Sequence, residues 1–178
     1  MSDGPNEAPF EGTVTERTGM VAHGPAFLYG RPIGQILVES FGLSPDRLDE
    51  GLRAQAEKGG RLGEVLVQLK AVTEEDVGRA LAAQLDLPWL AAISVDDVDP
   101  ELVKRVPINF AKQARLIPLR LEGEVAQLAI ADPIDTAVLD HARMLLQRDV
   151  NPQVALTATI VDAINQVYDR SINEAEQV

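Results

Sequence analysis

A segment of 24 residues occurs twice in this chain, and this repeat constrains the fold more than any other feature. Residues 32–55 align with residues 61–84 at a constant offset of 29 residues without a gap, and six of the 24 aligned positions are identical. Self-similarity at a fixed period indicates one supersecondary unit that is used twice. Two like units build a pseudo-symmetric surface, which suits a two-fold symmetric ligand or two like halves of a partner.

The second copy has the pattern of two consecutive helices. Leu62, Val65, Leu66 and Leu69 recur at the spacing of one helical face. Thr73 is expected to cap the next helix, because the three acidic residues after it fall where the helix dipole favours negative charge. The apolar side chains that this helix should bury are Val77, Ala80 and Leu81.

The first copy follows the same plan with different end signals. Gly42 can end its first helix, and Ser44 caps the next one, with Pro45 at the first helical position. Gly59 and Gly60 separate the two copies. The apolar side chains expected to face inward are Ile33, Ile36, Leu37, Phe41, Leu48 and Leu52.

From residue 87 onward the pattern changes to a mixture of strands and helices. Two apolar runs, 116–121 and 125–130, flank Glu122-Gly123 and predict a β-hairpin. The other expected elements are an extended segment at 87–90, short helices that begin at Asp99 and Asn109, a helix over 136–147 capped by Asp135, a strand over 152–156 and a helix capped by Thr157 that runs to Tyr168.

The predicted fold class is α+β. Residues 30–86 should form an α-helical subdomain of two repeated helix pairs, and residues 87–172 a small α/β subdomain in which helices flank a hairpin-containing sheet. Residues 1–29 are rich in Gly, Pro, Glu and Thr without a period, which is typical of a disordered leader. Residues 173–178 are a short tail.

Composition argues against several classes of function. The net charge is −12, so nonspecific binding to nucleic acid or acidic lipid is not expected, because it needs clustered Lys and Arg, whereas a local basic spot can still bind a small anion. The chain has no cysteine and no Gly-Lys dipeptide, which removes thiol chemistry and a Walker A loop. No apolar run reaches the ~18 residues of a membrane span, and the N-terminus lacks a secretory pattern. His23 and His141 suggest no metal pair, and no catalytic cluster is evident.

Gln55 and Gln84 end the two copies at equivalent positions, each on the apolar stripe of its helix. A buried amide without hydrogen-bond partners costs about 1–3 kcal/mol, so each amide needs a partner. Each glutamine either braces the backbone of the neighbouring copy or meets a polar ligand.

Arg61-Leu62-Gly63 opens the second copy and is a candidate anion site. Arg61 offers a guanidinium that pairs with phosphate or stacks on a purine, and Gly63 lets backbone N–H groups approach an anion. The alternative is that Gly63 serves close helix packing and that Arg61 is solvated. In the first copy Pro32 replaces the arginine, with Arg31 one residue earlier.

Asp132 and Asp135 lie between the predicted hairpin and the helix that follows it. Asp135 is expected to cap that helix. Asp132 falls in a tight strand-to-helix turn that can face the helical subdomain.

Together these segments resemble the N-terminal region of the type II secretion and type IV pilus assembly ATPases, the GspE/PilB/MshE group. The resemblance covers residues 31–170. It rests on RLGxxLVxxxxxTxxxVxxxLxxQ at 61–84 with its degenerate copy at 32–55, then LDLPWL, then LIPLRLEGEVAQLAIADPID at 116–135, and a closing TATIVDAINQVY. The order of these elements is more specific than any one of them.

The resemblance implies a function and a set of partners. Proteins of this group are cytoplasmic hexameric motors at the inner membrane, and their N-terminal region docks to the cytoplasmic part of an inner-membrane partner. We therefore expect a regulatory or docking domain of a type II secretion ATPase, cytoplasmic and held at the membrane through that partner. The alternative is a cyclic-di-GMP receptor module of a pilus ATPase or of a stand-alone relative.

The resemblance also locates catalysis outside this chain and names candidate ligand residues within it. ATP and Mg²⁺ would belong to the motor domain, and hexamers are expected only with that domain. Asp132 would accept hydrogen bonds from guanine. The residues that match the family's cyclic-di-GMP contacts are Arg61, Leu62, Gly63, Leu66 and Gln84 in the second copy, and Ile33, Gly34, Leu37 and Gln55 in the first, with Arg31 as a substitute for the missing arginine.

Overall fold

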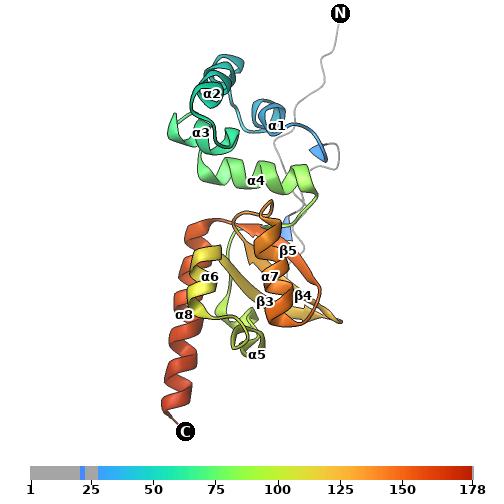
Figure 1. Ribbon diagram of the computed structural model, residues 1–178, viewed down its shortest axis with the longest axis vertical. Helices are drawn as coiled ribbons and strands as arrows, with labels where there is room; N and C mark the ends of the chain where they lie inside the picture. The colour runs from blue at the N-terminus through green and yellow to red at the C-terminus, as the bar shows by residue number, and fades with distance from the viewer. Residues whose placement is uncertain (1–20, 23–27, 178) are drawn as a thin grey trace, which may run out of the picture.

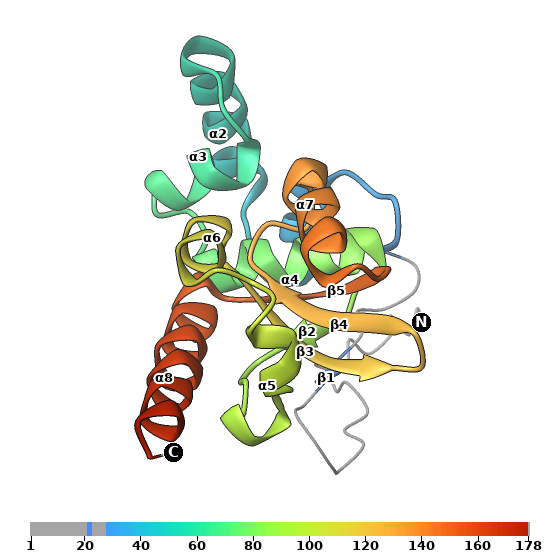
Figure 2. The same ribbon diagram turned by 60° about the horizontal axis from the view of Figure 1, so that its bottom comes forward.

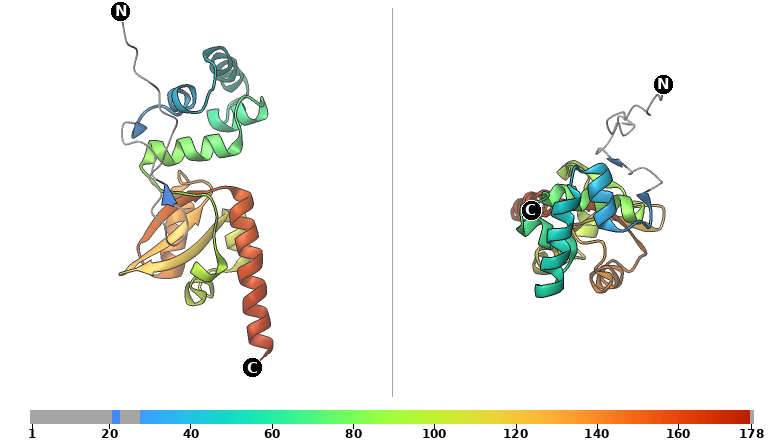
Figure 3. Two further views of the ribbon diagram at one scale, coloured as in Figure 1. Left: turned by 180° about the vertical axis from the view of Figure 1, so that it is seen from behind. Right: turned by 90° about the horizontal axis from the view of Figure 1, so that it is seen from above.

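The computed structural model describes residues 21–22 and 28–177, and it consists of two halves stacked along the long axis of the molecule (Figure 1). One half is built from four helices, and the other is a sheet with helices packed against it. Helix α4 (Glu74–Leu85) lies across the end of the sheet half and contacts strands β2 (Trp89–Leu90) and β5 (Val150–Ala155) (Figure 3). The α+β class predicted from the sequence is confirmed.

The helical half contains one helix pair twice. Its helices are α1 (Ile33–Ser40), α2 (Pro45–Lys58), α3 (Leu62–Gln68) and α4. Helices α3 and α4 begin 29 residues after α1 and α2, which is the offset of the sequence repeat. Ser44 caps α2, and Thr73 caps α4 through a capping box in which Thr73 and Asp76 each accept the other's backbone N–H. The duplicated pair is therefore present in the structure as well as in the sequence.

Both copies contribute to one apolar core. Leu37 and Leu66 occupy equivalent positions in the two copies, and both are fully buried in this core together with Leu28. Because each helix pair buries its apolar face mainly against the other pair, neither copy has a complete core of its own.

Leu52 is an exception to the predicted inward face of α2, because 43% of its surface is exposed. Helix α2 turns Gly51 toward α3 instead, and a Cβ atom added to Gly51 would lie 2.4 Å from Cδ2 of Leu66. Leu52 lies about 100° farther around the helix and therefore misses this close contact.

The other half contains a five-stranded mixed sheet with the order β1-β2-β5-β4-β3 (Figure 2). Strands β3 and β4 form the predicted antiparallel hairpin, β4 pairs in parallel with β5, and β5 pairs in parallel with β2. The remaining elements are β1 (Val21–Ala22), η2 (Val95–Asp97), α5 (Pro100–Val103), α6 (Ile108–Ala114), β3 (Leu116–Glu122), β4 (Val125–Ile130), α7 (Thr136–Leu146) and α8 (Thr157–Glu176).

Helices α5, α6 and α8 pack against β3, and α7 packs against β5. The core between the sheet and these helices includes the fully buried Leu128, Ile130, Ile160 and Ile164. Tyr168 of α8 donates a hydrogen bond from its hydroxyl to the Val106 carbonyl. Burial raises the pKa of Tyr168 to about 12, so its hydroxyl stays a donor over the physiological range.

The two ends of the last helix and the extent of the leader were predicted wrongly. The last helix does not end at Tyr168 but continues to Glu176, because no Gly or Pro follows to stop it, and Leu156 rather than Thr157 is its N-cap residue. The predicted disordered leader is wrong at residues 21–22, which form β1, and at Leu28, which is buried in the helical core. The rest of that leader, residues 1–20 and 23–27, lies outside the described residues.

In the part of the chain that the structure describes, no helix combines the length and the apolar character needed to cross a membrane. Across the same described residues, His, Cys, Asp and Glu side chains do not gather in groups of three that could hold a metal ion.

Candidate ligand-binding site

The two terminal glutamines brace the helical half in a reciprocal way. Gln55 at the end of the first copy donates from Nε2 to the Gly60 carbonyl, at 3.0 Å, immediately before the second copy. Gln84 at the end of the second copy donates from Nε2 to the Arg31 carbonyl, at 2.9 Å, immediately before the first copy. Gly60 and Arg31 are themselves 29 residues apart. Each amide nitrogen therefore holds the backbone that leads into the other copy, as the bracing hypothesis predicts.

The glycine at the start of each copy allows its two helices to approach closely. A Cβ atom on Gly34 would lie 2.9 Å from Cδ1 of Leu48, and one on Gly63 would lie 2.7 Å from Cγ1 of Val77. Leu48 and Val77 are again equivalent positions. Both glycines are buried, so the packing role proposed for Gly63 is present in the structure and is shared by Gly34.

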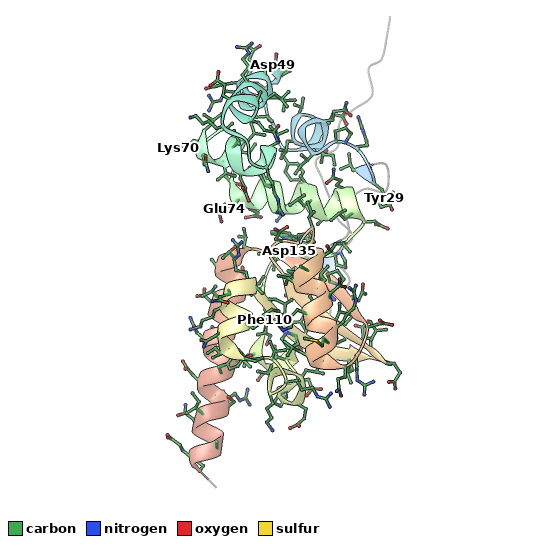
Figure 4. The ribbon with its side chains drawn as sticks, viewed as in Figure 1. Tyr29, Asp49, Lys70, Glu74, Phe110 and Asp135 are labelled. Atoms are coloured by element: carbon green, nitrogen blue, oxygen red, sulfur yellow. The ribbon has the colours of Figure 1, made fainter. Side chains whose placement is uncertain are left out.

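Arg61 joins the helical half to the α/β half. Its Nη1 donates to Oδ2 of Asp132, which lies in the turn between β4 and α7. The other carboxylate oxygen, Oδ1, accepts the backbone N–H of Ile134, so the carboxylate is fixed by its own turn. Asp135, which caps α7, lies at the end of the α/β half that faces the helical half (Figure 4).

The charge of Arg61 is stabilised by this contact. The hydrogen bond to Asp132 and the attraction of its negative charge raise the pKa of the Arg61 guanidinium above its ordinary value. The Arg61 side chain nevertheless keeps 51% of its surface exposed, compared with 23% for Asp132. The site thus presents a permanently charged and accessible guanidinium beside a partly buried carboxylate.

Arg31, the expected substitute for the arginine missing from the first copy, lies along α1. Its Nη1 and Nη2 donate to the two carboxylate oxygens of Glu39 at 2.5 and 2.6 Å, and Nη2 also approaches Oε1 of Gln35 at 3.4 Å. Both terminal nitrogens are therefore engaged with residues of α1, the helix that follows Arg31.

The predicted aliphatic residues divide into two groups. Leu37 and Leu66 are fully buried in the core of the helical half, out of reach of a ligand in this structure. Ile33 and Leu62, the first residues of α1 and α3, are only partly buried. They directly follow Pro32 and Arg61 in the chain. Among the predicted aliphatic contacts, these two are the ones that a ligand at the surface can reach.

Sequence reasoning missed Glu39, which determines where the Arg31 side chain lies. The repeat offers a signal for it, because the position equivalent to Glu39 in the second copy is the uncharged Gln68. The contact between Arg61 and Asp132 was anticipated only as a turn that can face the helical half, since the two residues are 71 positions apart in the chain.

Residues 85–174 match the family model of the MshEN domain. Among curated proteins, the bacteriophage adsorption protein B of Escherichia coli is 30% identical over 79% of this chain, which covers 18% of that protein. The type IV pilus assembly ATPase PilB of Myxococcus xanthus is 28% identical and the type II secretion system protein E of Xanthomonas campestris 32%, each over 76% of this chain. The chain covers 24% of each of these two proteins, and so less than a quarter of the length of all three.

Two solved structures resemble the whole two-part arrangement. A structure of MshE with cdg, cyclic di-GMP, aligns with a TM-score of 0.65 at 27% identity, and covers 78% of this chain and 99% of that one. The N-terminal domain of XpsE aligns with a TM-score of 0.60 at 31% identity, and covers 75% of this chain and 91% of that one. The matches fall on the N-terminal domain and not on an ATPase motor domain.

Proposed function

Because the chain belongs to the MshEN domain family, we propose that it is the N-terminal regulatory domain of a secretion or pilus assembly ATPase and that it binds cyclic di-GMP on the doubled motif. The observation that carries this proposal is the alignment with MshE in its cyclic-di-GMP structure, which spans 99% of that chain and includes both halves. Cyclic di-GMP is a two-fold symmetric ligand with two guanines and two phosphates, and the doubled motif offers it two like surfaces.

The proposed contacts follow from the geometry around Arg61. Its exposed guanidinium pairs with a ligand phosphate or stacks on a guanine. The Asp132 carboxylate beside it is suited to accept hydrogen bonds from guanine N1–H and N2–H. Ile33 and Leu62 supply apolar contact at the surface. The glycines, the buried leucines and the terminal glutamines keep the two copies in register beneath the ligand.

Isothermal titration with cyclic di-GMP tests this proposal. We expect micromolar or tighter binding by the wild-type domain, its loss in Arg61→Ala, and no comparable binding of GTP. Arg143→Ala is the matched control, because it removes another partly exposed arginine from an ion pair, with Asp140 on α7, away from the motif. Binding that survives Arg61→Ala, or no heat from the wild-type protein at saturating ligand, would contradict the proposal. Thermal melting of each variant checks that the fold is retained.

A second candidate function is docking to the cytoplasmic domain of an inner-membrane secretion protein, with this domain coupling the motor of the same protein to that partner. The likeness to the XpsE N-terminal domain and to a type II secretion protein E favours it. In this case the domain acts in the cytoplasm, at the membrane surface, and forms hexamers only together with the motor.

The two candidates differ in their sensitive residues. Docking should depend on exposed apolar side chains of the helical half, such as Tyr29 and Leu52, which are 65% and 43% exposed. In a binding assay with the cytoplasmic partner domain, Leu52→Asp should weaken the complex while Arg61→Ala leaves it intact. The reverse pattern would favour nucleotide binding as the primary role.

A further inference from the structure

We infer that the two copies of the motif are unequal anion half-sites, in which Arg61 anchors the ligand on the second copy while Glu39 holds Arg31 away from the first. This inference rests on the proposed function and concerns how the same site is tuned. It starts from the position that opens each copy, where the first copy has Pro32 and the second has Arg61.

Arg31 is close enough in sequence to supply the missing charge. It precedes Pro32 directly, and its backbone is fixed, because its carbonyl accepts the Gln84 amide and its N–H donates to the Leu28 carbonyl. Only the Arg31 side chain is therefore free to change its direction. A swing of the Arg31 side chain toward the first turn of α1 would place a guanidinium at the start of the first copy, the place equivalent to that of Arg61 in the second.

The contacts of Arg31 oppose that swing. The guanidinium makes a two-pronged contact with both oxygens of Glu39, which is the strong geometry for an arginine–carboxylate pair. Glu39 lies near the far end of α1, and side chains on a helix point back toward its N-terminus, so the pair meets over the middle of the helix beside Gln35. The guanidinium is thereby neutralised and displaced from the start of α1.

Arg61 is held differently. The described hydrogen bond to Asp132 uses Nη1 alone, and half of the side chain is open to solvent. The second copy also has no carboxylate at the position of Glu39, where Gln68 stands instead. A ligand phosphate can therefore approach Arg61 without first displacing a two-pronged carboxylate, whereas at Arg31 it must compete with one.

The matched pair of variants is Glu39→Gln and Glu50→Gln. Each removes one negative charge from an exposed ion pair of the first copy, but Glu50 pairs with Arg47 and leaves Arg31 untouched. Exposed ion pairs are worth up to about 1 kcal/mol, so Glu39→Gln should tighten cyclic-di-GMP binding about two- to five-fold, while Glu50→Gln leaves the affinity unchanged. Arg31→Ala should have little effect in the wild-type protein and should abolish the gain in the Glu39→Gln background.

Each outcome separates this inference from the function it rests on. Tighter binding by Glu39→Gln that depends on Arg31 supports unequal half-sites. Equal affinities of the wild-type protein, Glu39→Gln and Glu50→Gln, or a gain that persists without Arg31, would overturn them while leaving the receptor function in place. An absence of binding in all variants would instead reject the receptor function, and unequal half-sites with it.

Discussion

Helices α2 and α4 occupy equivalent places in the two copies of the motif, yet their surroundings differ. The one residue of α2 that is buried is Gly51, whereas α4 buries Ala80, Ala82 and Ala83. Helix α4 packs against α1 and α3 on one side and against β5 and β2 on the other, while α2 contacts only helices of its own half among its main neighbours. The position in the stack, and not the repeated pattern, therefore decides how much of each helix is buried.

The polar residues show a second difference between the copies. The first copy has Pro32 where the second has Arg61, and a simple cap at Ser44 where the second has the full capping box at Thr73. The second copy, which carries the contact to the α/β half, is thus also the one with the full capping box. The two copies thus share one core but differ in their surfaces, and the following variants test this comparison.

The largest effect is expected from the equivalent core leucines. Leu37→Ala and Leu66→Ala should each lower the free energy of unfolding by about 2–5 kcal/mol, because both side chains are fully buried in one cluster. Leu52→Ala is the control, since it shortens an exposed leucine of the same half and should stay within about 0.5 kcal/mol. Urea denaturation measures all three. A large loss for one core leucine alone would show that the copies do not share their core equally.

The second largest effect is expected at the glycines that open the copies. A methyl group on Gly63 meets Val77, which is stiff because it is β-branched, whereas one on Gly34 meets the end of the more flexible Leu48. Gly63→Ala should therefore destabilise by about 1–3 kcal/mol. Gly34→Ala should cost less, because the end of the Leu48 side chain can move aside, whereas the gain in helix propensity of about 1 kcal/mol is common to both variants. Thermal unfolding compares the two variants. A greater loss of stability for Gly34→Ala than for Gly63→Ala would contradict this expected order.

The behaviour of these positions explains how much of the fold was predictable. The repeat, the apolar periodicity and the capping residues are local signals, so the four helices, the hairpin and the caps at Asp99 and Asp135 could be predicted from the sequence. The exposure of Leu52 could not be predicted, because it depends on which face α2 turns toward α3. The C-terminal end of α8 was missed, because the sequence after Tyr168 has no Gly or Pro that would mark the last residue of the helix.

The candidate site was predictable only as a set of residues and not as a set of contacts. The repeat identified Arg61, Gln55 and Gln84 as special positions. Their partners lie in other segments, and the reciprocal bracing and the pairing with Asp132 appear only when the chain is folded. Arg31 shows the same limit. Its position in the sequence fits a ligand contact, but in the folded chain its guanidinium pairs with Glu39 instead.

A smaller effect is expected from the unequal caps. Thr73→Ala removes an acceptor for the Asp76 N–H and breaks the capping box, so it should cost about 1 kcal/mol. Ser44→Ala should cost less, because the contact from Arg47 N is longer, at 3.3 Å, and stands alone. Thr73→Ser keeps the hydroxyl and should restore most of the stability in the same denaturation assay. Equal losses for both alanine variants would remove this difference between the copies.

The smallest effect on stability is expected from the ion pair between Arg61 and Asp132, although it joins the two halves. Exposed pairs contribute about 0.2–1 kcal/mol, and Arg61 is half exposed, so most of the attachment must come from the apolar contact of α4 with β2 and β5. A double-mutant cycle of Arg61→Gln and Asp132→Asn should give a coupling in this range that shrinks at high salt. A coupling above about 3 kcal/mol, or one insensitive to salt, would mean that the pair is a structural anchor and not available to a ligand. A small coupling is what a ligand site requires, because a phosphate can compete for Arg61 only if its present partner is held weakly.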